Sequence, residues 1–180
     1  IRTDYFIPVR TKEGYGLSEE GMAHAIERCG GKPDVIIAVD CGTSSVEEVA
    51  WLQTQGIDVV ILDHHEASTL GRPPAVAVVN AKLEESSPFT YLCSAGVVFK
   101  LAHAMLKQRR LPQFDLKQHL DVVAIATVAD IVPLVEENRL LTRHGLRVME
   151  SGGNIGIQAL NRVTNLNRRP SASHVSFRIG

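Results

Sequence analysis

The sequence lacks the features by which several large classes of protein are recognised. No apolar run reaches the ~18 residues that a membrane-spanning helix needs, and no basic and apolar leader opens the chain. The Gly-x-Gly-x-x-Gly, P-loop and nucleophile-elbow motifs are also missing, which argues against nucleotide-cofactor oxidoreductases, P-loop NTPases and α/β hydrolases. We therefore expect no membrane partner and none of these three chemistries.

Cysteine is scarce, and neither sign of charge is in excess. Cys29, Cys41 and Cys93 have no Cys-x-x-Cys spacing, so we expect reduced thiols in a cytoplasmic protein rather than disulfides or a zinc site. Cys41 fits a small buried residue. Lys and Arg total 19 against 20 Asp and Glu, so a polyanion such as nucleic acid would have to be bound by a local patch or through metal.

Two apolar runs end abruptly in polar side chains. Residues 34–39 run into Asp40, and residues 59–62 run into an Asp-His-His triplet at 63–65. A strand interior cannot bury such groups without partners, because each unpaired polar group costs several kcal/mol. The polar residues must therefore meet solvent, a ligand or a metal.

The segment between these runs predicts a helix. Residues 44–55 carry a Ser-x-x-Glu capping signal at Ser44 and Glu47, and Gly56 provides a stop. The result is a βαβ unit with a right-handed crossover, whose parallel strands lie about 4.8 Å apart if they are adjacent. Asp40 and the triplet then share one carboxyl edge, where open α/β sheets place ligands.

The remaining pattern predicts more strands and then helices. We expect a strand over residues 5–9 and a loop over 10–17. A helix capped by Ser18 is expected to follow, to residue 29, and to stop at Gly30. A further strand is expected over 75–79, and helices over 94–108, 116–129 and 139–150. Residues 151–173 fit a linker or a polar helix, and another strand is expected to begin at 178–180.

Asp and His are the ligand types expected for Mn²⁺ or Mg²⁺ in phosphoester chemistry, in which carboxylates bridge paired cations. Asp130 is a candidate third acidic ligand, because it separates two apolar runs and Pro133 halts any helix soon after it. From spacing alone, a helix cap or a buried ion-pair partner is the favoured interpretation of Asp130, ahead of a ligand.

Four motifs in order resemble those of the DHH phosphoesterase superfamily: Val39–Ser44, Asp63–His65, Ser94–Phe99, and Val128–Leu134 with Glu137–Arg139. Within that superfamily they look most like the bacterial exonucleases specific for single-stranded DNA, and the loop from Arg10 to Ser18 shares this likeness. The resemblance covers nearly the whole chain. It implies an α/β fold in which a parallel-sheet DHH domain, with helices on both faces, occupies residues 1–150.

The resemblance also implies a role for each candidate residue. Asp40 would bridge two Mn²⁺ or Mg²⁺ ions, His64 would bind one of them and Asp130 the other. His65 would contact the phosphate, and Asp63 would accept a hydrogen bond that orients a histidine ring. The implied reaction is 5′→3′ hydrolysis of single-stranded DNA by metal-activated water, in DNA repair and recombination. Implied partners are single-stranded DNA, a single-stranded-DNA-binding protein and a helicase.

The chain departs from the superfamily at both ends. An Asp-x-Asp motif would precede Ile1, and a second, substrate-gripping (DHHA1-type) domain would begin within 151–180. We therefore expect the chain alone to bind metal weakly and to turn over little or nothing. Asn80 is followed by Ala81, where relatives usually have proline, a minor departure.

Four features have two interpretations. The helix opening with Ser94 and Gly96 would hold a phosphate or is a simple N-cap. The Gly-Tyr-Gly loop at 14–16 would place an aromatic ring under a base or is ordinary turn chemistry. Residues 168–169, an arginine pair, would touch a phosphate or are solvated, and Trp51 packs on the sheet or stacks on a base.

Two other functions compete with the exonuclease. One is a phosphodiesterase for short oligonucleotides or cyclic dinucleotides, and the other is a catalytically inactive DHH scaffold. The intact Asp40, His64, His65 and Asp130 argue against the scaffold.

Overall fold

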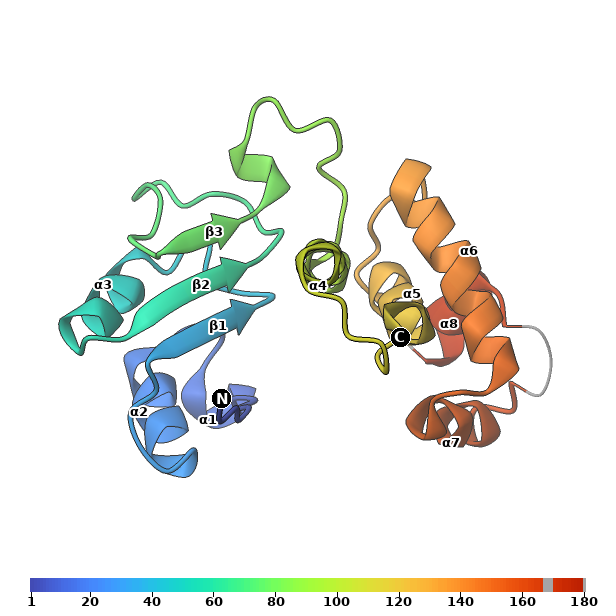
Figure 1. Ribbon diagram of the computed structural model, residues 1–180, viewed down its shortest axis with the longest axis horizontal. Coiled ribbons are helices and arrows are strands. Elements are labelled where there is room, and N and C mark those ends of the chain that lie inside the picture. The colour runs from blue at the N-terminus through green and yellow to red at the C-terminus, as the bar shows by residue number, and fades with distance from the viewer. Residues whose placement is uncertain (167–169, 180) are drawn as a thin grey trace. The chain divides into compact units, whose positions relative to one another are not determined.

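The computed structural model describes residues 1–166 and 170–179 (Figure 1). The chain divides into two compact units, Ile1–Pro88 and Phe89–Gly180, and each is described by itself. The expected domain boundary at residue 150 stays a prediction. In the residues described, no helix is both long and apolar enough to cross a membrane.

The first unit contains a three-stranded sheet. Its strands are β1 (Val35–Val39), β2 (Asp58–Leu62) and β3 (Ala77–Val79), in the order β1-β2-β3. Both pairings are parallel, as the arrows in Figure 1 show. The predicted parallel α/β arrangement is confirmed, although β3 begins two residues later than expected.

The three strands end in register, at Val39, Leu62 and Val79. The residues that follow, Asp40, Asp63 and Asn80, therefore stand side by side at one edge of the sheet. Two backbone hydrogen bonds extend the ladder to this row, from the Asp40 N–H to the Leu62 carbonyl at 3.0 Å and from the Asp63 N–H to the Val79 carbonyl at 3.1 Å. The ends of the strands are thus fixed by the same pairing that forms the sheet.

Helices α2 (Glu19–Arg28) and α3 (Val46–Thr54) form the core of this unit with one face of the sheet. The sheet residues buried in this core are Ala38, Val59 and Ile61, and the latter two alternate along β2, as one face of a pleated sheet requires. Leu62 is also buried but is not part of this cluster. Helix α2 begins as predicted, because the Ser18 side chain accepts the Gly21 N–H. Packing and pairing together hold the carboxyl edge in place.

The predicted strand over residues 5–9 is wrong. The structure has no strand there, and the chain instead leads into a single helical turn, α1 (Arg10–Glu13), within the expected loop. Tyr5 and Ile7 are largely exposed, so this apolar segment has no neighbouring strand to pair with. A strand pattern without a partner does not form a strand.

The expected capping box at Ser44 is also wrong. Helix α3 has Ser45 as its N-cap, and no side chain caps it. The Ser45 N–H instead bonds to the Gly42 carbonyl at 3.0 Å, so the segment before the helix is a turn. This turn carries Thr43 toward the strand ends, which explains why the helix starts later than its sequence signal.

The second unit is helical. It contains α4 (Ser94–Gln108), the short 3₁₀ helix η2 (Leu116–His119), α5 (Leu120–Ala129), α6 (Glu136–Ser151), α7 (Ile155–Val163) and α8 (Ala172–Arg178). Its buried core contains Val128, Met149, Ile157 and Val175. The prediction for 94–108 is confirmed, and the helix expected over 116–129 forms with a 3₁₀ first turn.

The region after residue 151 differs from the linker interpretation. Helices α7 and α8 occupy much of it, which agrees with the alternative of a helix. The strand expected to begin at 178 is wrong, because α8 runs to Arg178 and buries Val175 in the helical core. The arginine pair at 168–169 lies outside the described residues.

Candidate metal centre

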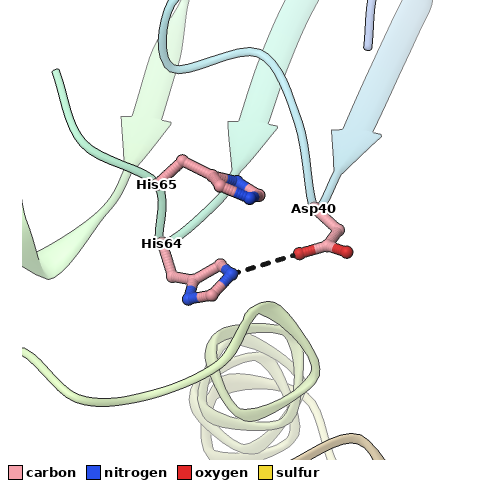
Figure 2. A group of neighbouring side chains, drawn as sticks. All are labelled: Asp40, His64 and His65. Atoms are coloured by element: carbon pink, nitrogen blue, oxygen red, sulfur yellow. Dashed lines mark ion pairs between the residues drawn. The ribbon is translucent and has the colours of Figure 1, made fainter. Parts of the chain in front are cut away.

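Asp40, His64 and His65 meet at the carboxyl ends of β1 and β2 (Figure 2). Each offers one ligand atom, and these three atoms lie within 4.8 Å of one another. Nε2 of His64 is 3.4 Å from Oδ1 of Asp40. The convergence predicted from the two strand ends is therefore found, and its cause is the register of the parallel strands.

Asp40 has an uncommon backbone conformation. Its φ is +64°, in the left-handed region that aspartate tolerates better than most residues other than glycine. The chain turns sharply here. Two residues later, Gly42 has φ +108°, and a Cβ added to it would lie 3.1 Å from the Ile61 side chain. Backbone strain of this kind clusters at functional sites. The carboxylate itself is 60% exposed, whereas the His64 side chain is only 13% exposed.

Asp63 is the buried anchor of the centre, with a side chain that is 1% exposed. Its Oδ2 accepts the Thr43 N–H at 2.9 Å, and its Oδ1 accepts the His64 N–H at 2.8 Å and the His65 N–H at 3.3 Å. Burial raises the pKa of Asp63, but the hydrogen bonds outweigh it and lower the pKa to about 2. A fixed negative charge therefore lies beneath the two histidines.

The same carboxylate fixes one histidine ring. Nδ1 of His65 lies 2.7 Å from Oδ1 of Asp63, and because an ionised carboxylate only accepts, Nδ1 is the protonated nitrogen. Nε2 of His65 then carries the lone pair, and the hydroxyl of Tyr15 lies 3.2 Å from it. The ring is held at both nitrogens.

Asn80 joins the three strand ends, a role that the sequence analysis missed. Its buried side chain donates from Nδ2 to Thr43 Oγ1 at 2.9 Å and to the His65 carbonyl at 2.8 Å, and its Oδ1 accepts the Lys82 N–H at 3.0 Å. Asn80 directly follows an apolar strand, as Asp40 and Asp63 do. This position in the sequence could have predicted its role.

Cys41 follows Asp40 and is half-buried. Burial raises the pKa of its thiol to about 11, and the carboxylates of Asp63 and Asp40 contribute to the rise. Since the thiolate is the form that binds metal, this cysteine is a poor ligand. A small buried residue is expected at Cys41, and the structure buries it only in part.

The other predicted site residues lie in the second unit. Asp130 is the exposed C-cap of α5, and the next residue, Ile131, has φ +56°, a strained conformation for a β-branched side chain. Ser94 is buried at the first turn of α4, but the N-cap is Cys93, so Ser94 is not the cap. Gly96 is buried in the same turn. Whether these residues complete the centre at Asp40 stays a prediction.

Comparison with known proteins identifies similar sequences. Residues 1–127 match the sequence model described as "DHH family, N-terminal domain". The chain is 38% identical over 164 residues to the single-stranded-DNA-specific exonuclease RecJ of Bacillus subtilis (strain 168). This alignment covers 91% of this chain and 20% of that relative. It is 36% identical to RecJ of Escherichia coli (strain K12), over 98% of this chain and 32% of the relative. The chain thus spans a third or less of the length of these relatives.

Solved structures give the same match. The "Crystal structure of exonuclease RecJ bound to manganese" superposes with a TM-score of 0.82 at 31% identity, covering 97% of this chain and 42% of that one. RecJ from Thermus thermophilus in complex with Mn²⁺ superposes with a TM-score of 0.75 at 29% identity, covering 89% and 23%. A structure of that protein with Mg²⁺ also matches, with a TM-score of 0.59.

Proposed function

The chain belongs to the DHH family, and from that premise we propose that it is part of a metal-dependent nuclease that hydrolyses single-stranded DNA, as its RecJ relatives are named for doing. The observation that carries the proposal is the convergence of Asp40, His64 and His65 at the strand ends. The chain spans a third or less of those relatives, so the activity is proposed for the longer protein.

The donor set fits a divalent cation. Oδ1 of Asp40 and Nε2 of His64, which lie 3.4 Å apart, suit Mn²⁺, and Mg²⁺ would favour the carboxylate oxygens. Asp40 and His64 would hold the metal, with Asp130 as a further carboxylate ligand. When bound, the cations polarise the phosphodiester and lower the pKa of water at the site.

The chain's own residues have separate tasks in this proposal. The carboxylate of Asp40 is exposed at the edge of the sheet, and the buried Asp63 accepts a hydrogen bond from Nδ1 of His65 and holds its ring. His65 would contact the scissile phosphate. Ser94 and Gly96, in the first turn of α4, would offer backbone N–H groups to a phosphate of the strand.

We also propose the finer features that the motifs imply. These are 5′→3′ direction, a role in DNA repair and recombination, a cytoplasmic location, and cooperation with a single-stranded-DNA-binding protein and a helicase. Their support is the likeness of the motifs and the names of the relatives.

The experiment that tests the function uses the full-length gene product. Digestion of 5′-labelled single-stranded DNA with Mn²⁺ is compared among wild type, Asp40→Ala, His64→Ala and His103→Ala, the last being an exposed histidine in α4. We expect wild type and His103→Ala to release the labelled 5′ nucleotide and the other two variants to leave the label on the full-length strand. Hydrolysis of cyclic dinucleotides but not of DNA would point to the other phosphodiesterase, and no cleavage by wild type would point to an inactive scaffold.

A further inference from the structure

Tyr15 lies outside the predicted centre and contacts the ring of one of its histidines. Its hydroxyl lies 3.2 Å from Nε2 of His65, although 50 positions separate the two in sequence. The two rings meet edge to face, with centroids 6.3 Å apart and an interplanar angle of 88°. The guanidinium of Arg10 lies 4.8 Å from the Tyr15 ring centroid, a distance at which a cation is attracted to the ring face.

The hydrogen bond has only one direction that satisfies both groups. Nδ1 of His65 donates to Asp63, so Nε2 of the neutral ring can only accept. The Tyr15 hydroxyl must therefore be the donor. Since a metal would bind through the same lone pair of Nε2, the hydroxyl and a cation compete for one position.

The loop that carries Tyr15 has a backbone suited to this placement. Gly14 has φ +79° and ψ −162°, a combination that is essentially restricted to glycine, and Gly16 has φ +78°. Neither glycine has a neighbouring atom within 4 Å of where a Cβ would stand. A side chain would have room at these two positions. Glycine is therefore required by the backbone conformation that presents the tyrosine, and not by a lack of space.

We propose that Tyr15 is a positioning residue for His65: its hydroxyl occupies Nε2, holds the ring against Asp63, and keeps this histidine out of the metal's ligand set. The Tyr15 hydroxyl thereby gives different roles to two adjacent histidines whose ring centroids are only 4.6 Å apart. His64 is left to bind the cation, and His65 is kept for the substrate. The substrate role of His65 rests on the proposed function, whereas its hydrogen bond to Tyr15 does not.

The test is ¹⁵N NMR of the histidine rings in the metal-free 180-residue chain at pH 8, where imidazole is mostly neutral. A His65→Gln variant assigns the signals. In Tyr15→Phe we expect the Nε2 signal of His65 to move while its Nδ1 signal, still bonded to Asp63, stays. Tyr5→Phe is the control, because Tyr5 is 82% exposed, and it should move neither. Gly14→Ala keeps the hydroxyl but strains the loop, and should move Nε2 as well.

A second readout uses Zn²⁺ as a diamagnetic probe of imidazole binding. At a Zn²⁺ concentration that moves the His64 signals, Nε2 of His65 should stay in place in wild type and move in Tyr15→Phe. An Nε2 signal that is identical in wild type and Tyr15→Phe, or that moves together with His64 in wild type, would overturn the proposal. Neither readout depends on nuclease activity, so loss of the proposed function would leave the result interpretable.

Discussion

The two units bury polar side chains for different purposes. The first unit buries Thr43, Asp63 and Asn80. Thr43 links the other two, because its N–H donates to the Asp63 carboxylate and its hydroxyl oxygen accepts from the Asn80 amide. Together they hold the histidines at the strand ends. In the second unit, buried Asn138 donates to the carbonyls of Tyr91 at 2.6 Å and Pro133 at 3.0 Å, and so ties loops to α6. Burial of a polar group is therefore no sign of a site by itself; what matters is whether its partners carry reactive side chains.

We therefore predict that changes at the strand ends alter metal binding, whereas a change at the equally buried Asn138 in the helical unit alters only stability. The largest effect is expected for Asp40→Ala in the full-length protein. Loss of a direct ligand should lower Mn²⁺ affinity by more than the roughly 10–100-fold that loss of an outer partner costs. Calorimetry measures the change. Affinity within about threefold of wild type would remove Asp40 from the ligand set.

Asn80→Ala and Asn138→Ala form a matched pair that sharpens the contrast. Each removes a buried amide that donates two hydrogen bonds, so each should lower the free energy of unfolding by about 1–3 kcal/mol. Only Asn80→Ala should also weaken Mn²⁺ binding, by roughly 10–100-fold. Urea unfolding and calorimetry measure the two quantities. Equal losses of metal affinity in both variants would break the distinction.

Asp63 predicts a dependence of stability on pH that belongs to the first unit. Its folded pKa of about 2 lies below its ordinary value of 3.8, so its contribution is present above pH 4 and is lost as the pH falls through 2. The shift corresponds to about 2 kcal/mol. Urea unfolding at pH 5 and pH 2.5 should show this loss in wild type and a smaller one in Asp63→Asn. The same slope in both proteins would assign the acid sensitivity to other groups.

The smallest effect concerns Cys41. With a thiol pKa of about 11, only about one thiol in a thousand is ionised at pH 8. Alkylation of folded Cys41 by iodoacetamide should therefore be far slower than in the urea-unfolded chain, as mass spectrometry of the peptide would show. Cys41→Ala should leave Mn²⁺ affinity unchanged. Rapid labelling in the folded chain would mean that the thiol is more ionised than its surroundings imply.

The sequence predicted what depends on local pattern. The apolar runs before Asp40 and Asp63 predicted β1 and β2, and their parallel pairing predicted the shared edge that the structure has. The helix over 94–108 followed from its periodicity. Residues 5–9 have the composition of a strand but form none, because pairing depends on a neighbour that composition does not reveal.

The supporting contacts could not be predicted for the same reason. Tyr15 and His65 are 50 positions apart, and Asn80 and Thr43 are 37 apart, so only the folded chain shows that they meet. The Ser44 signal failed because the turn at residues 42–45 serves the strand ends rather than the helix. Sequence pattern thus located the reactive groups, and tertiary structure supplied the residues that hold them.

We propose that the strand ends at Asp40 and His64 hold a divalent cation, and Mn²⁺ titration of the ¹⁵N-labelled chain is the direct test of this binding. Paramagnetic broadening reports even weak binding. We expect the signals of residues 39–42 and 63–66 to broaden at the lowest Mn²⁺ concentration, and Asp40→Ala to abolish this broadening. Broadening spread over exposed acidic residues such as Glu19 and Glu20, unchanged by Asp40→Ala, would contradict it.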